Sequence, residues 1–110
     1  MKFFTILHIT SYFLFAEGLG ELLFNGNCQT CHFKTKSISA PSIKIVQQRY
    51  KNAFKTEKQF VKYMTNFVLK PNSNISLMHD MIDKYELMPE MVFEQDVVED
   101  ISKYIYNEHF

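Results

Sequence analysis

Apolar residues recur at the spacing of one helix face in two stretches of the second half of the chain. In the first stretch these residues are Phe60, Met64, Phe67 and Val68. In the second stretch they are Val97, Ile101, Tyr104 and Ile105. Both sets follow the positions i, i+4, i+7 and i+8, which lie on one side of an α-helix. The pattern predicts amphipathic helices over residues 56–70 and 94–107.

Capping and breaking residues bound these helices, and weaker patterns predict shorter ones. Thr56 is a suitable N-cap for the first stretch, and Pro71 ends it. Residues 17–27, 43–51 and 75–85 also have helical patterns, and Ser42 is positioned to cap the second of these. Residues 33–41 and 87–91 show no periodicity. We therefore predict an all-α fold of about four to five helices.

Composition narrows the class of protein. The chain has 110 residues, 46% of them hydrophobic, which is too hydrophobic for a disordered chain. It is also too short for a TIM barrel or a doubly wound dinucleotide-binding fold. Three Gly, three Pro and no Trp argue against an all-β fold with many tight turns. Twelve basic and twelve acidic residues balance, so no nucleic-acid partner is expected.

Residues 1–16 have the pattern of an export signal. Lys2 precedes a mostly apolar run that ends in Ala16, as in the n-region, h-region and small-residue cleavage site of a signal peptide. The run is shorter than the ~20 residues of a membrane-spanning helix, so no stable membrane insertion is expected. We expect cleavage near Ala16 and a single domain over residues 17–110. A retained anchor and a buried N-terminal helix are the alternatives.

The most informative motif is Cys28-x-x-Cys31-His32, the attachment sequence of c-type haem. Two thiols three positions apart on a helical turn point the same way, and each can add to one haem vinyl group. The adjacent histidine then offers a ring nitrogen to the iron as its proximal ligand. Three other uses compete: a dithiol redox site, which usually lies in a βαβ pattern, a zinc site, which needs two further ligands, and a structural disulfide, which leaves the histidine unexplained.

A six-coordinate haem needs a second axial ligand, and a methionine thioether is common in electron-transfer cytochromes. Beyond Met1 the candidates are Met64, Met78, Met81, Met88 and Met91. The first three lie on predicted apolar helix faces, where methionine often fills gaps. Met88 precedes Pro89 in the aperiodic segment, and a loop residue can be aimed at an iron without distorting a helix. We predict Met88 as the sixth ligand, with Met91 as the alternative.

Over about residues 18–106 the chain resembles the class I single-haem cytochromes c of the small bacterial periplasmic type. The matching residues of the first helix and attachment motif are Gly20, Phe24, Cys28, Cys31 and His32. Met88-Pro89 resembles the axial methionine segment of the family. The chain departs from the family in lacking glycines after the motif. It also carries rival ligands in His79 and the extra methionines, although His79 is expected to face solvent.

The resemblance implies a cytochrome c fold wrapped around one haem. In this family the carbonyl of Pro41 would accept a hydrogen bond from His32, and Tyr104 would pack against Gly20. The implied function is a monomeric periplasmic one-electron carrier rather than an enzyme. Its donor would be a quinol-oxidising complex or a dehydrogenase, and its acceptor a terminal oxidase or reductase. The alternatives are a haem enzyme or gas-sensing haem domain with a labile sixth ligand and, third, a dithiol oxidoreductase.

The balanced total charge hides an asymmetry along the chain. Residues 28–70 contain nine Lys and Arg residues against a single acid, Glu57, whereas residues 71–110 contain two lysines against nine acids. Solvated helix faces account for most such charges, but a molecular dipole would also orient the protein toward a redox partner. The lysines from Lys34 to Lys70 are therefore candidates for a basic docking face.

Overall fold

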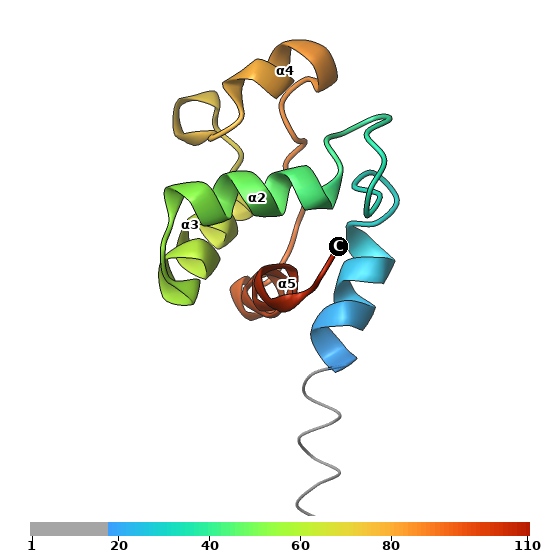
Figure 1. Ribbon diagram of the computed structural model, residues 1–110, viewed down its shortest axis with the longest axis vertical. Helices are drawn as coiled ribbons and strands as arrows, with labels where there is room; N and C mark the ends of the chain where they lie inside the picture. The colour runs from blue at the N-terminus through green and yellow to red at the C-terminus, as the bar shows by residue number, and fades with distance from the viewer. Residues whose placement is uncertain (1–17) are drawn as a thin grey trace, which may run out of the picture.

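The computed structural model describes residues 18–110, and all regular elements in this range are helices (Figure 1). An N-terminal helix occupies residues 18–27. It is followed by α2 (Ile43–Ala53), α3 (Glu57–Leu69), the short 3₁₀ helix η1 (Ser73–Ile75), α4 (His79–Tyr85) and α5 (Gln95–Asn107). The predicted all-α class is confirmed, whereas the wrapping around a haem stays a prediction. The predicted signal peptide, residues 1–16, lies outside the described residues.

The helix starts follow the predicted caps. The hydroxyl of Ser42 accepts a hydrogen bond from the amide of Ile45 at the start of α2, and the hydroxyl of Thr56 accepts one from Gln59 at the start of α3. Each bond satisfies an amide that the helix itself leaves without a partner. Glu94 occupies the N-cap position of α5, so the predicted start of the last helix is also confirmed.

The predicted helix over residues 75–85 is too long. In the structure a 3₁₀ turn covers residues 73–75, and α4 begins only at His79. Two polar side chains explain the difference, because each captures a backbone amide two residues ahead. The Asn72 carbonyl oxygen Oδ1 accepts from Asn74, and Ser76 Oγ accepts from Met78. Such local bonds compete with a continuous helix.

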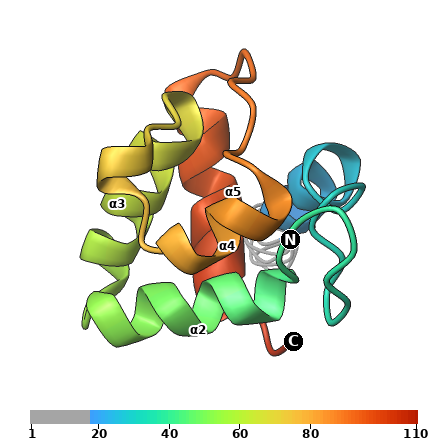
Figure 2. The ribbon, with the colours of Figure 1, turned by 90° about the horizontal axis from the view of Figure 1, so that it is seen from above.

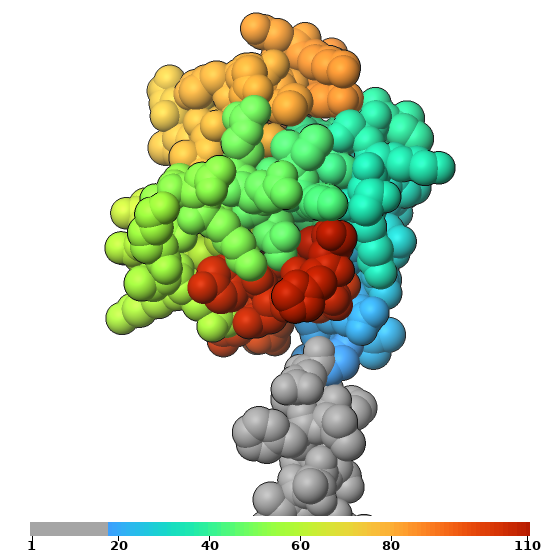
Figure 3. All heavy atoms as spheres, viewed as in Figure 1, coloured from blue at the N-terminus to red at the C-terminus, as the bar shows by residue number. Residues whose placement is uncertain are grey.

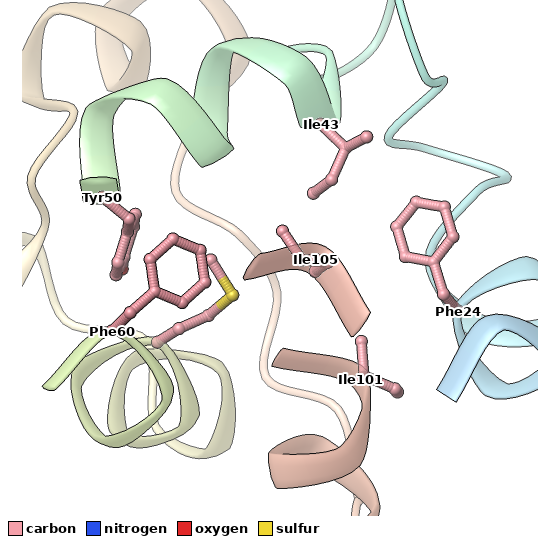
Figure 4. Packing of buried hydrophobic residues seen from close by; sticks show 7 residues of the cluster. Phe24, Ile43, Tyr50, Phe60, Ile101 and Ile105 are labelled. Carbon is pink, nitrogen blue, oxygen red and sulfur yellow. The ribbon is translucent and has the colours of Figure 1, made fainter. Parts of the chain in front are cut away.

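The hydrophobic core forms where α2, α3 and α5 meet the N-terminal helix, as Figure 4 shows. Its buried members are Phe24, Ile43, Tyr50, Phe60, Met64, Ile101 and Ile105. The two predicted stripes therefore do contribute to the core. The inward face of α5 is wider than its stripe, because Val98 and Ser102 are also fully buried. Ser102 lies beside Thr65 of α3, with 3.5 Å between the two hydroxyl oxygens.

The N-terminal helix packs closely against α5. Phe24 is completely buried, and its ring centroid lies 5.4 Å from that of Tyr104. A Cβ added to Gly20 would lie only 2.9 Å from the Asp100 carbonyl oxygen and 2.9 Å from the Tyr104 Cβ. The contact implied by the family resemblance is thus present. Gly20 lies inside the helix, where the close approach of α5 requires a residue without a side chain.

The last turn of α5 is tied to α2 by a buried amide. Gln47 Nε2 donates to the carbonyl oxygens of Ile105 and Glu108, at 2.7 Å in both cases. Carbonyls at a helix C-terminus have no partner within the helix, so Gln47 satisfies groups that would otherwise be left in the interior. This bond joins residues about sixty positions apart in the chain.

The segment with η1 and α4 forms one end of the molecule, beyond α2 and α3 (Figures 1 and 3). Viewed from that end, α4 lies across the bundle between α2 and α5 (Figure 2). Arg49 of α2 connects it to the rest of the protein through an ion pair with Asp80, with 2.7 Å between Nη2 and Oδ2. No helix within residues 18–110 is long and apolar enough to cross a membrane.

Candidate functional site

The attachment motif continues the N-terminal helix by one further turn. The amide of Cys28 donates to the carbonyl of Phe24 at 2.8 Å, and the amide of His32 donates to the carbonyl of Cys28 at 2.8 Å. These bonds have the spacing of an α-helix. Both cysteines are free thiols, so the disulfide alternative is not formed here; Cys28 is half-buried and Cys31 is exposed.

The imidazole of His32 is oriented by the backbone of Pro41. The distance from His32 Nδ1 to the Pro41 carbonyl oxygen is 2.7 Å. Because a carbonyl only accepts hydrogen bonds, Nδ1 carries the ring proton, and the lone pair of the neutral ring lies on Nε2. This is the hydrogen bond that the family resemblance implies. A partner on one ring nitrogen is the usual arrangement for a histidine that binds a metal through the other.

Two backbone bonds support this arrangement from the loop that follows the motif. The amide of Ile43 donates to the carbonyl of Phe33 at 2.9 Å, and the amide of Lys44 donates to the carbonyl of Lys34 at 3.2 Å. The start of α2 is thereby attached to the residues directly after His32. Residues 33–41, which lack periodicity in the sequence, form a loop whose two ends are closed against each other.

One mainly apolar cavity collects the predicted site residues. Cys28, Cys31 and His32 line it from the end of the N-terminal helix, together with Pro41, while Met88 lines it from the segment after α4. The cavity also reaches side chains of α2, α3 and α5. A histidine, two thiols and a thioether around an apolar space form the donor set that a c-type haem requires, so the residues present fit this group.

All five candidate methionines line this cavity. Met64 is part of the packed core, and Met78 is buried at the N-cap of α4. Met91 is 36% exposed. Met88 is half-buried in a segment without helical structure. The structure therefore brings Met88 into the same cavity as His32, but it also brings the rival methionines there. His79 is exposed on α4.

Burial shifts the pKa values of His32 and Cys28. It lowers the pKa of His32, an effect that the hydrogen bond to Pro41 opposes, so the ring is neutral and can donate its lone pair to a metal. Burial raises the pKa of Cys28 to about 11, with a smaller contribution from the nearby Cys31. Dithiol redox enzymes instead lower the pKa of their reactive cysteine. The environment of Cys28 is thus opposite to that of such a site.

Two tyrosines are among the polar residues around the cavity. Tyr50 and Tyr85 line it, and burial raises the pKa of Tyr50 to about 12. Tyr63 lies elsewhere, stacked on Phe54 with ring centroids 4.3 Å apart. Within residues 18–110, no three His, Cys, Asp or Glu side chains gather closely enough to hold a metal ion by themselves.

Some features of the site could not be foreseen from residue types. The periodicity assigns Phe67 and Val68 to the packed face of α3, yet both are only half-buried and line the cavity. An apolar residue that faces an internal cavity has the same sequence pattern as one that faces the core. Glu86 also lines the cavity, in an unusual backbone conformation that no signal in the sequence marks.

No protein-family model, no curated protein and no solved structure matches this chain. Its function is therefore inferred from the motif and from the geometry of the cavity.

Proposed function

We propose that this protein is a one-electron carrier with a single haem c. Cys28 and Cys31 would hold the haem covalently, and His32 and Met88 would be its axial ligands. The observation that supports this best is the hydrogen bond of 2.7 Å from His32 Nδ1 to Pro41, in a cavity that both thiols also line. This bond leaves Nε2 of a neutral imidazole available to an iron.

The two cysteines would form thioether bonds with the haem. Each S–H group adds across one vinyl double bond, so that a C–S and a C–H bond form and nothing leaves. The reaction is therefore neutral in electrons and protons. An uncharged thiol at Cys28, whose pKa burial raises to about 11, is consistent with a residue that is modified once during maturation. It would then act as an anchor.

The thioether of Met88 and the hydrogen bond of His32 would tune the redox centre. A bound haem supplies the ferric–ferrous couple, and a thioether ligand favours the ferrous state. The hydrogen bond from His32 to Pro41 keeps the ring from rotating. If His32 and Met88 both bound the iron, no coordination site would be left for a substrate. This arrangement favours electron transfer over catalysis.

A haem domain with a labile sixth ligand is the second candidate function. It is favoured by one observation: no backbone hydrogen bond joins residues 87–93, which contain Met88, to the rest of the described chain. A weakly anchored ligand could give way to a gas or a peroxide. The two functions differ in coordination, because a carrier stays low-spin and six-coordinate, whereas the alternative binds carbon monoxide readily when reduced.

The cellular setting follows from the motif and from the family resemblance. Haem attachment to C-x-x-C-H and an N-terminal export signal favour a periplasmic protein that works as a monomer. Its donor would be a quinol-oxidising complex or a dehydrogenase, and its acceptor a terminal oxidase or reductase. A pull-down from periplasmic and membrane fractions, using the haem-loaded protein, would identify these partners.

The central experiment is to produce the full chain in the periplasm of a host that attaches c-type haem. The expected product carries one haem that stays bound after denaturation, with a pyridine haemochrome spectrum of the c type. Cys28→Ala and Cys31→Ala should each leave a single thioether, seen as a shifted haemochrome band. A matched control is Thr35→Ala, an exposed position in the same loop that does not line the cavity. Absence of covalent haem from the wild-type protein would reject the proposal.

A further inference from the structure

Glu86 has a backbone conformation that residues with a side chain rarely adopt. Its φ is 67° and its ψ is 170°. Among residues 18–110 it is the only non-glycine residue with a positive φ. This combination belongs to a region that is essentially restricted to glycine, and it persists in other residues only when the surrounding structure enforces it. The backbone at Glu86 is therefore strained.

The chain before Glu86 is linked to α2 by a bidentate ion pair on the protein surface. Arg49 of α2 donates from Nη1 and Nη2 to the two carboxylate oxygens of Asp80, at 3.0 and 2.7 Å. Two parallel bonds of this kind fix the orientation of the pair as well as its distance. The amide of Glu86 itself donates to the carbonyl of Ile82 at 2.8 Å and ends α4. This side of Glu86 therefore continues a helix that is paired with α2.

The chain after Glu86 is not anchored in this way. Residues 87–93 contain no helical turn, and no backbone hydrogen bond joins them to the remainder of the described chain. Val92 is fully exposed, and Leu87 and Met91 are each more than a third exposed. Segments with few contacts and free backbone groups open most easily. We call residues 87–93 the ligand segment, because Met88 belongs to it.

The torsions of Glu86 contribute to where Met88 lies. Only Leu87 separates the two residues, and Pro89 restricts the backbone of Met88 to extended conformations. The backbone torsions of Glu86 and Leu87 are therefore the main freedoms with which the ligand segment can swing relative to α4, and Glu86 is the strained residue of the two. Glu86 and Met88 both line the cavity that holds His32, so such a swing changes the distance of Met88 from the site.

We propose that Glu86 is a strained hinge that positions Met88 and makes the sixth iron ligand exchangeable. The inference rests on the proposed haem function. With Met88 in the cavity, Glu86 is confined to the region that favours glycine. When the ligand segment moves outward, Glu86 can relax to an ordinary backbone conformation. The released strain lowers the free energy needed for Met88 to leave, so a small ligand such as imidazole can take its place.

Two substitutions at this position separate backbone strain from charge. Glu86→Gly removes the Cβ and with it the strain, while Glu86→Gln keeps the Cβ and removes only the charge. The measurement is the rate at which saturating imidazole binds to the ferric, haem-loaded protein, because that rate is then limited by departure of Met88. We expect Glu86→Gly to slow binding by about tenfold. Glu86→Gln should bind imidazole at the wild-type rate.

The outcomes distinguish the hinge from the haem function on which it rests. A wild-type protein without covalent haem would overturn both proposals. A loaded protein in which Glu86→Gly binds imidazole at the wild-type rate would overturn the hinge alone, even if that variant unfolds at a higher temperature. Equal slowing by Glu86→Gln would assign the effect to the carboxylate and would also overturn the hinge.

Discussion

Gly20 and Tyr104 are in contact where the N-terminal helix crosses α5, so that a Cβ at position 20 would lie 2.9 Å from the Tyr104 Cβ. The same Cβ would lie 2.9 Å from the backbone carbonyl oxygen of Asp100. Backbone and Cβ atoms cannot move aside as the end of a flexible side chain can. The two helices therefore keep their separation only with glycine at this position.

The first prediction is that Gly20→Ala destabilises the protein by about 1–3 kcal/mol, the usual cost of forcing extra atoms into a packed site. The matched control is Gly18→Ala in the same helix, since nothing lies within 4 Å of a Cβ there. Alanine is favoured over glycine in a helix by about 1 kcal/mol, so the control should be neutral or stabilising. Urea unfolding of the haem-loaded proteins measures both. Equal stabilities would contradict the close approach.

The second prediction tests the sixth ligand. Met88→Ala should abolish the weak near-infrared sulfur-to-iron band of the oxidised protein and lower its reduction potential, because a thioether ligand favours the ferrous state. Met91→Ala should leave both unchanged. The near-infrared spectrum and a redox titration give the answer. If Met91→Ala loses the band and Met88→Ala keeps it, the ligand lies three residues further along the chain.

The third prediction concerns the ion pair that anchors α4. The Arg49 guanidinium lowers the pKa of Asp80, with a smaller contribution from His79. The folded pKa thus lies below the unfolded one, and the pair stabilises the protein fully above the unfolded pKa. This stabilisation is lost as the pH falls through the folded pKa. Since both side chains are partly exposed, the effect is small and salt-sensitive.

Thermal unfolding as a function of pH tests this prediction. At neutral pH, Asp80→Asn should unfold at a slightly lower temperature than the wild type, and the difference should vanish in strong acid. Asp83→Asn, on the same helix but outside the ion pair, serves as the control. A difference that persists in acid would mean that Asp80 acts through something other than its charge.

The fourth prediction concerns the basic region. All eight lysines between residues 28 and 70 are exposed, so they are available to an acidic redox partner. Encounter rates with such a partner should fall as salt is added, because the Debye length is ~10 Å at ~0.1 M ionic strength. Lys34→Glu, close to the attachment motif, should reduce this dependence more than Lys58→Glu on α3. Electron-transfer rates that are flat with salt would leave the lysines as solvated surface.

Much of the fold follows from short-range signals in the sequence. Ser42 and Thr56 cap α2 and α3 as predicted, because a capping bond involves only residues three positions apart. The start of α4 was missed, since Asn72 and Ser76 bind nearby amides that a helix would also use. That competition depends on side-chain conformations, which apolar periodicity does not report.

The candidate site likewise has some features that the sequence predicts and others that it does not. The positions of Cys28, Cys31 and His32 depend on a single helical turn, so their common location in one cavity follows from spacing. The choice of Met88 among five cavity-lining methionines depends on how distant segments meet. The strain at Glu86 had no signal at all, because the unusual torsion belongs to a residue type that normally avoids it.

The bonds that close the loop after His32 make that loop a natural place for new sequence. Its ends are joined by the His32–Pro41 bond and by the bond from Ile43 to Phe33, whereas residues 35–39 are exposed. Doubling the length of a flexible loop costs only ~0.6 kcal/mol. A peptide inserted between Thr35 and Lys36 would therefore extend outward without moving the imidazole. At that point a surface-binding tag could attach the protein to an electrode with the proposed haem ligands undisturbed.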